Sequence, residues 1–136
     1  MHGNRSLNDN VGAVNQNNLI GNDSLNNNFG NVIANRVVGD NSGNANGANF
    51  NNNTLIGGVS GNGNGQGFER NKILGETSGN TAGANVSDNI IIGDRSGNEI
   101  RDNSNFNTVV GSDSGNRIDG DFNLVFGKGS FESRVG

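Results

Sequence analysis

The stretch from Asn107 to Ser130 reads N-T-V-V-G-S-D-S-G-N-R-I-D-G-D-F-N-L-V-F-G-K-G-S and contains the repeat unit of the whole chain. The unit is N-x-h-h-G-x-x-S, where h is aliphatic or aromatic. Its glycine recurs every 18 residues from Gly21 to Gly111 and then, after a shorter step of 16 residues, at Gly127; Gly3 marks a first partial copy. Such spacing is typical of a repeat protein.

Asparagine and serine keep the same register as the glycine. A serine follows each glycine by three positions, and an asparagine stands at every ninth position from Asn8 to Asn116. The asparagines that precede the glycine by four positions are Asn17, Asn35, Asn53, Asn71, Asn89, Asn107 and Asn123. Side-chain amides that stack in phase can each donate to one neighbour and accept from the next. We therefore expect these asparagines to form an internal structural ladder.

The composition favours stacked strands over helices. Hydrophobic residues make up only 29% of the chain and glycine occurs 24 times, which by itself would be typical of disorder. A disordered segment has no reason to keep a fixed register, however, and stacked repeats are stable with few apolar residues each. Asn, Gly and Ser are poor residues for helix interiors, and the short aliphatic segments closed by glycine favour β-strands.

These patterns predict an all-β fold, a β-solenoid of about seven 18-residue coils with internal asparagine ladders. We expect residues 1–136 to form one domain and to be a piece of a longer repetitive protein. The asparagine in the middle of each repeat favours a flattened coil of two nine-residue halves. A triangular coil of three hexapeptides is the alternative.

The second half of each repeat has one apolar residue that we expect to anchor it in the core. These anchors are Val14, Val32, Phe50, Phe68, Val86 and Phe122. The repeat before the last has Ser104 at this position and an aromatic residue at Phe106 instead.

The paired aliphatic residues predict an outward apolar column, because adjacent residues in a strand face opposite sides. If the asparagine and the first aliphatic residue point inward, the second points outward. The outward column is then Ile20, Val38, Ile56, Leu74, Ile92, Val110 and Phe126. A soluble monomer seldom exposes such a stripe. It indicates an interface between copies of the chain, or a face that binds an extended surface such as ice or a glycan; alternatively, both residues are buried at a corner.

The remaining composition argues against several partners. The net charge is −4 and no basic patch with interleaved aromatic residues occurs, so we expect no nucleic-acid partner. No apolar run is long enough to span a membrane. The calcium-roll motif G-G-x-G-x-D is missing, so we expect no metal and no other cofactor. Asp23, Asp40, Asp94 and Asp113 lie near the turns without a common register.

We also expect no enzymatic activity. The serines recur without a neighbouring base, and the sole histidine is His2. Asp119 and Asp121 beside Glu132 are the nearest approach to a carboxylate cluster of the kind that acts on polysaccharides. The four N-x-[ST] sequences, at Asn4, Asn22, Asn52 and Asn85, are expected by chance in so asparagine-rich a chain.

The run F-N-T-V-V-G-S-D-S-G-N-R-I-D-G-D-F-N-L-V-F-G resembles the head repeats of trimeric autotransporter adhesins. Those heads are left-handed β-rolls whose repeats carry an aliphatic-Gly-x-x-Ser/Ala pattern and whose three chains associate along apolar sides. The run is also similar to the x-x-N-x-V-x-G repeats of plant ice-recrystallisation inhibitors, which stack internal asparagines. Both families use coils shorter than the 18 residues found here.

Together these observations predict a non-enzymatic, extracellular or cell-surface module that is structural or adhesive. Its partner would be a second copy of itself, in a trimer, another homo-oligomer or a filament. The alternative function is ice binding or inhibition of ice recrystallisation. Arg36 and Lys72 lie on the same strands as the outward column and make it less regular than a dedicated ice-binding face.

Overall fold

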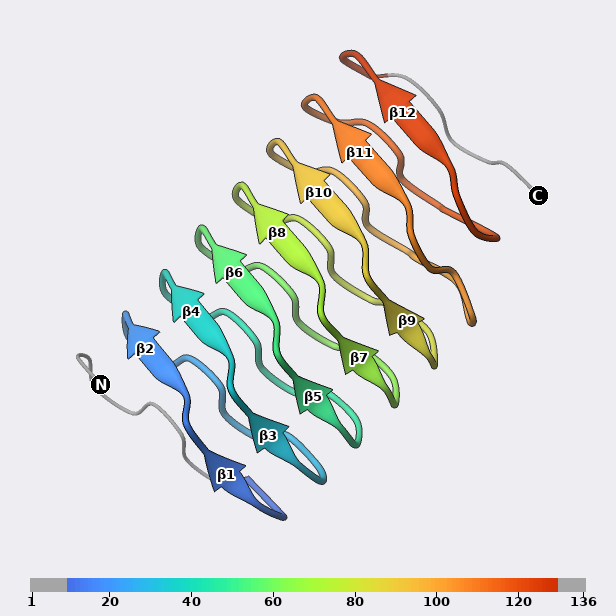
Figure 1. The fold of residues 1–136 in the computed structure, drawn as a ribbon. Coiled ribbons are helices and arrows are strands. Elements are labelled where there is room, and N and C mark those ends of the chain that lie inside the picture. The colour runs from blue at the N-terminus through green and yellow to red at the C-terminus, as the bar shows by residue number, and fades with distance from the viewer. Residues whose placement is uncertain (1–9, 130–136) are drawn as a thin grey trace.

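The computed structural model describes residues 10–129, in which the chain winds into a parallel β-solenoid (Figure 1). The described residues contain strands, turns and bends but no helix, so the predicted all-β fold is confirmed. They make about six turns, close to the number expected. The predictions made for His2, Gly3, Asn4, Asn8 and Glu132, and the two ends of the serine series, lie outside the described residues.

Each turn contributes one strand to a seven-stranded parallel sheet. Its strands are β2 (Asn18–Ile20), β4 (Arg36–Val38), β6 (Thr54–Ile56), β8 (Lys72–Leu74), β10 (Ile90–Ile92), β11 (Thr108–Val110) and β12 (Leu124–Phe126). A five-stranded sheet consists of β1 (Val14–Asn15), β3 (Val32–Ile33), β5 (Phe50–Asn51), β7 (Phe68–Glu69) and β9 (Val86–Ser87). Equivalent residues of successive coils pair in register, for example Leu55 with Ile73.

Each coil is flattened, and its two long sides differ. Figure 1 shows both strands of a coil following each other along one long side, while an irregular segment returns along the other. The return side still bonds coil to coil, since the backbone N–H of Gly47 donates to Asn64 O at 2.7 Å. The coil therefore has the flattened shape that the sequence favoured, but its strands lie on one side only.

The core is one layer of side chains between the two sides of the coil. The first aliphatic residue of each repeat points into this layer. These residues are Leu19, Val37, Leu55, Ile73, Ile91, Val109 and Val125, all buried. Val32, Phe50, Phe68 and Val86 join them as anchors, and the rings of Phe50 and Phe68 stack with centroids 5.4 Å apart. Stacking equivalent residues lets one apolar side chain per half-repeat build a continuous core.

The prediction that Phe122 is a core anchor is wrong. Its side chain is 75% exposed. The reason is the 16-residue last step, which places Gly120 rather than Phe122 next to Ser104, so that Gly120 N–H donates to Ser104 Oγ at 3.1 Å. Phe122 instead lies beside Phe106, with ring centroids 5.2 Å apart. Both rings are outside the core.

Left-handed backbone bends turn each coil at fixed positions. One such bend recurs at Asp23, Asn41, Val59, Thr77, Arg95 and Asp113, with φ between 51° and 57°. Asparagine and aspartate tolerate this conformation, whereas a β-branched residue is strained in it. Val59 and Thr77 are therefore the two residues at this bend with unsuitable side chains, and Val59 is the one without a polar group.

We expect Val59→Asn to stabilise the protein by about 1 kcal/mol, because asparagine adopts left-handed backbone more readily than valine. The Val59 side chain is 46% exposed, so little packing is lost. Urea unfolding measures the difference. Val38→Asn is the control, since Val38 lies in a strand with ordinary backbone and should gain nothing. Equal stability of the Val59 variant and the wild type would contradict the assignment of strain.

Candidate functional site

The asparagines of the predicted structural ladder line the interior of the solenoid. Asn35, Asn53, Asn71, Asn89, Asn107 and Asn123 are buried, and Asn17 at the start of the series is partly exposed. Asn35 shows the pattern: its Nδ2 donates to Asn17 Oδ1 at 3.0 Å and to Phe50 O at 2.7 Å. Its backbone N–H donates to the same Oδ1 at 2.9 Å. Each amide thus bonds two coils, which confirms the buried ladder.

A second buried ladder, which the sequence analysis missed, lies on the return side. Asn46 Nδ2 donates to Asn28 Oδ1 at 2.8 Å, and Asn64 Nδ2 donates to Asn46 Oδ1 at 2.9 Å. The series begins at Asn10 and is continued after Asn64 by Ala82, Ile100 and Ile118, which are also buried. This position carries asparagine in some repeats and isoleucine in others. That exchange is the signal in the sequence that would have identified the position as internal.

The asparagines at the middle of each repeat have a different role. Asn44, Asn62, Asn80, Asn98 and Asn116 are only partly buried. Asn62 Nδ2 donates to Asn41 O at 2.7 Å, and its Oδ1 accepts the N–H of Asn44 at 2.6 Å. These amides tie the backbone turns together from outside the core.

The serine series closes the corner after each strand. Ser42 is buried, and its Oγ donates to Gly57 O at 2.7 Å. The same oxygen accepts the N–H of Ser60 at 3.1 Å. Hydroxyls bonded in this way, repeated along the coils, join each corner to the corner of the next coil.

The predicted outward column lies on the outer face of the seven-stranded sheet. Parallel pairing puts its members side by side, as for Ile56 with Leu74 and Ile92 with Val110. The exposed fractions are 47% for Ile20, 37% for Leu74, 41% for Ile92 and 62% for Phe126, while Val38, Ile56 and Val110 are partly exposed. The second aliphatic residue is therefore outside the core, unlike the first.

A mixed column runs beside this apolar column. It consists of Asn18, Arg36, Thr54, Lys72, Ile90, Thr108 and Leu124. The column is polar over the first four strands of the sheet and becomes mainly apolar over the last three. The two columns together form the outer face.

Ion pairs join neighbouring coils outside the core. Arg70 donates to both carboxylate oxygens of Asp88, from Nε at 2.8 Å and from Nη2 at 2.7 Å. Arg101 pairs with Asp119 at 3.1 Å and Arg117 pairs with Glu99 at 3.5 Å. Exposed pairs of this kind contribute little each.

The hydrogen bonds from Arg70 lower the pKa of Asp88, against a smaller opposing effect of burial. A depressed carboxyl pKa contributes stability above the unfolded-state value of about 3.9 and loses it as the pH falls through the folded-state pKa. We expect Asp88→Asn to cost less than about 1 kcal/mol at neutral pH and nothing at low pH. Urea unfolding of both proteins across this range tests the prediction. A difference that persists in acid would contradict it.

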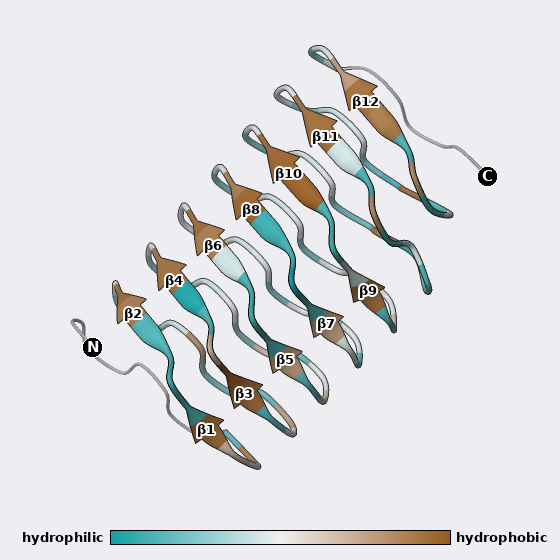
Figure 2. Ribbon diagram, in the orientation of Figure 1, coloured by the Kyte–Doolittle hydropathy of each residue, from teal (hydrophilic) through white to brown (hydrophobic). Residues whose placement is uncertain are grey.

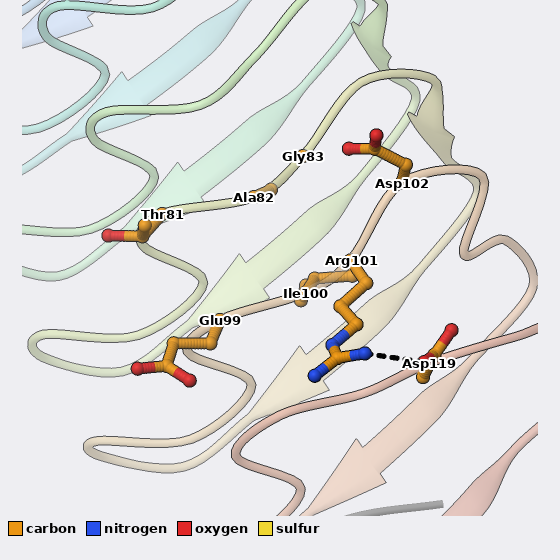
Figure 3. A pocket seen from close by; sticks show the side chains of 8 residues that line it. All are labelled: Thr81, Ala82, Gly83, Glu99, Ile100, Arg101, Asp102 and Asp119. Atoms are coloured by element: carbon orange, nitrogen blue, oxygen red, sulfur yellow. Dashed lines mark hydrogen bonds and ion pairs between the residues drawn. The ribbon is translucent and has the colours of Figure 1, made fainter. Parts of the chain in front are cut away.

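A surface hollow of about 520 Å³ opens on the return side (Figure 3). It is lined by Thr81, Ala82, Gly83, Glu99, Ile100, Arg101, Asp102 and Asp119. Figure 3 shows Arg101 turned toward Asp119, its ion-pair partner. Asp102 Oδ1 accepts the N–H of Ala84 at 2.8 Å. The charged groups that line the hollow are thus engaged, Arg101 and Asp119 with each other and Asp102 with the backbone.

The carboxylates considered for chemistry are likewise engaged. Asp121 Oδ1 accepts the N–H of Asn105 at 2.6 Å, and Asp119 binds Arg101. Asp40 and Asp94 each accept a backbone N–H from the preceding coil. Within residues 10–129, no group of three or more acidic, histidine or cysteine side chains is placed to hold a metal ion.

By its fold the chain is a parallel β-solenoid protein. A search of protein families, of curated proteins and of solved structures finds no match to it. Among the described residues there is no helix long and apolar enough to cross a membrane. The outer face of the seven-stranded sheet is the candidate functional site, because each of its strands places an apolar side chain in the outward column.

Proposed function

We propose that this protein is a non-enzymatic structural or adhesive module of the cell surface or extracellular space, which associates with further copies of itself through the outward apolar column. The observation that carries the proposal is the exposure of this column on a regular sheet face. Burying apolar surface is favourable by roughly 25 cal/mol per Å². A second copy with the same column offers a matching surface.

The design of the interior supports a structural role. Asparagine and serine side chains are used to join coils, and no buried side-chain nitrogen or oxygen among residues 10–129 lacks a hydrogen-bond partner. A rod built in this way presents the same surface repeatedly and at fixed spacing. The similarity of the repeats to trimeric autotransporter adhesin heads, which associate along apolar sides, points in the same direction.

Ice binding is the second candidate, supported by the in-register spacing of the apolar column. Arg36 and Lys72 favour self-association instead, because long charged side chains on the same face interrupt close contact with a flat crystal. Ice-recrystallisation inhibition by a strictly monomeric protein would decide for ice binding.

The double substitution Ile56→Asp and Ile92→Asp is expected to abolish self-association and leave the solenoid folded. Both side chains point out of the core, whereas a charge placed in an apolar interface is strongly unfavourable. Light scattering after size exclusion measures the mass of the assembly, and circular dichroism reports the fold.

The matched control is Phe29→Asp with Val59→Asp. These two residues are 63% and 46% exposed and lie outside the strands of the seven-stranded sheet. The control should keep the wild-type mass. A wild-type protein that stays monomeric, or a folded Ile56/Ile92 variant that still assembles, would refute the proposal.

A further inference from the structure

The apolar surface of the outer face is concentrated at one end of the rod. Figure 2 shows β10 and β12 brown over their length, whereas β2, β4 and β8 begin in teal. The exposed fractions at this end are 37% for Ile90, 41% for Ile92 and 63% for Leu124. We call the outward side chains of β10, β11 and β12 the terminal patch: Ile90, Ile92, Thr108, Val110, Leu124 and Phe126.

The stacked rings of Phe106 and Phe122 extend the apolar character of this end. They lie two residues before β11 and β12, and they are 52% and 75% exposed. The first coils have Gln16 and Ala34 at the equivalent left-handed positions. Two rows that are polar or small in the N-terminal coils thus become mainly apolar toward the C-terminal end, although the coil of β10 keeps Asp88 at the position of the rings and β11 begins with Thr108.

Opposite charges stand at two corners of the terminal patch. Asp94 follows the glycine after β10 and Lys128 follows the glycine after β12, so both lie at the same end of the strands, two coils apart. Both side chains are exposed. Between them, Asp113 accepts a hydrogen bond from Arg95, which is the main cause that lowers the pKa of Asp113, and the charge of Lys128 adds to this effect.

We propose that two copies of the chain pack antiparallel, terminal patch against terminal patch, about a two-fold axis along β11. This inference rests on the proposed self-association and specifies its geometry. Such an axis places the β10 coil of one copy against the β12 coil of the other. Residues at the same position along the strand then face each other. Leu124 then faces Ile90 of the second copy, and Lys128 faces Asp94. By symmetry the ion pair forms twice.

Charge distinguishes this arrangement from a parallel one. An axis along the rod would keep the coils in step and reverse the direction along the strands. Asp94 would then lie opposite Asp88, whose carboxylate already accepts hydrogen bonds from Arg70, so Asp94 would gain no cationic partner in the second copy. The antiparallel pair gains two ion pairs between Asp94 and Lys128 that the parallel pair lacks, and this charge complementarity favours it.

The patch is small, which sets the strength of the contact. Three coils at roughly 4.8 Å and seven residues at roughly 3.3 Å give a face of about 14 by 23 Å. Stable complexes bury about 800 Å² per partner, which is well above the area of a face with these dimensions. We therefore expect a weak dimer, with the four N-terminal coils of each rod extending in opposite directions.

Charge exchange is the first test, with light scattering from about 10 μM to about 1 mM, the range that resolves weak dissociation constants. Asp94→Lys and Lys128→Glu are each expected to weaken the dimer roughly tenfold or more, and the double variant to restore it. Asp40→Lys is the matched control: Asp40 follows the equivalent glycine in the second coil and also accepts one backbone N–H, but it lies outside the contact.

The orientation is tested with a spin label at Asn18→Cys, in a chain that has no native cysteine. Asn18 lies five coils from β11, so two labels in the antiparallel dimer should be roughly 48 Å apart, and in a parallel dimer under roughly 20 Å. A short distance, or a double charge variant that stays weak, would overturn this arrangement while self-association stands. A monomer at every concentration would refute both.

Discussion

Replacing Gly75 with alanine is expected to destabilise the solenoid by about 4 kcal/mol or more, one of the largest effects available to a single methyl group in this protein. Gly75 belongs to the column that ends each strand of the seven-stranded sheet. Its φ is +140°, a region that residues with a side chain rarely adopt.

A side chain at position 75 would also have no space. A Cβ atom on Gly75 would lie 2.6 Å from the carbonyl carbon of Gly93, and closer still to its oxygen. The obstacle is backbone, so no side-chain rotation relieves it. Since Gly93 meets Gly111 in the same way, the coils would have to separate at this point. The hydrogen bond from Gly75 N–H to Ile56 O would be strained too.

Gly63→Ala provides a matched control. Gly63 also has a positive φ, +66°, but nothing lies within 4 Å of its added Cβ. That substitution should cost only about 1 kcal/mol, the conformational preference of glycine alone. Urea unfolding followed by circular dichroism compares the two. If both variants lost the same free energy of unfolding, close contact between coils would not be the reason for glycine at these positions.

Much of the fold follows from the register of the sequence alone. The glycine, the asparagine before it and the first aliphatic residue recur in phase because each contacts its own equivalent in the next coil. This contact is visible where Asn53 bonds Asn35 and where Leu55 pairs with Ile73. Periodicity therefore predicted strands, coil length and the buried ladder together.

The departures from the register were harder to predict. The last step shortens by two residues, from 18 to 16, and the sequence does not state where the missing residues are removed. The structure removes them before the last anchor position, which expels Phe122 and leaves Gly120 beside Ser104. Side chains alternate between inside and outside only along a strand. Phe122 lies in a bend, so this rule could not place its side chain.

The candidate site was predictable in part. Alternation along a strand placed Ile56 and Ile92 outside, as the structure has them. The second buried ladder was not anticipated, because Asn28, Asn46 and Asn64 give way to other residues in the later coils. The proposed pairing of Asp94 with Lys128 of a second copy was not anticipated either, since it depends on which strands together form the apolar end of the outer face.

Replacing Asn71 with leucine is the other substitution with a large expected effect, about 3 to 5 kcal/mol of lost stability. Leucine has the same branching as asparagine but a larger volume, so the change removes hydrogen bonds without opening a cavity and also crowds the core. Asn71 is 1% exposed and occupies the middle of the first ladder.

The cost arises from the groups left behind in the core. Asn71 Oδ1 accepts the backbone N–H and the Nδ2 of Asn89, both at 3.0 Å, and Asn71 Nδ2 donates to Val86 O at 2.8 Å. After the substitution the N–H of Asn89 has lost its acceptor. An orphaned buried donor costs about 1 to 3 kcal/mol, and the freed carbonyl of Val86 adds to it. The leucine side chain repays only part of this by its apolar surface.

Asn18→Leu separates the effect of the ladder from that of the residue type. Asn18 lies on the exposed outer face, so the same exchange there should change the free energy of unfolding by less than about 0.5 kcal/mol. Hydrogen exchange adds a local measurement: the Asn89 amide should lose protection in the Asn71 variant, because its hydrogen-bond acceptor is the side chain that was removed. If the Asn71 and Asn18 variants were equally stable, hydrophobic packing rather than amide stacking would hold the coils together, and the ladder would be a consequence of the fold rather than one of its causes.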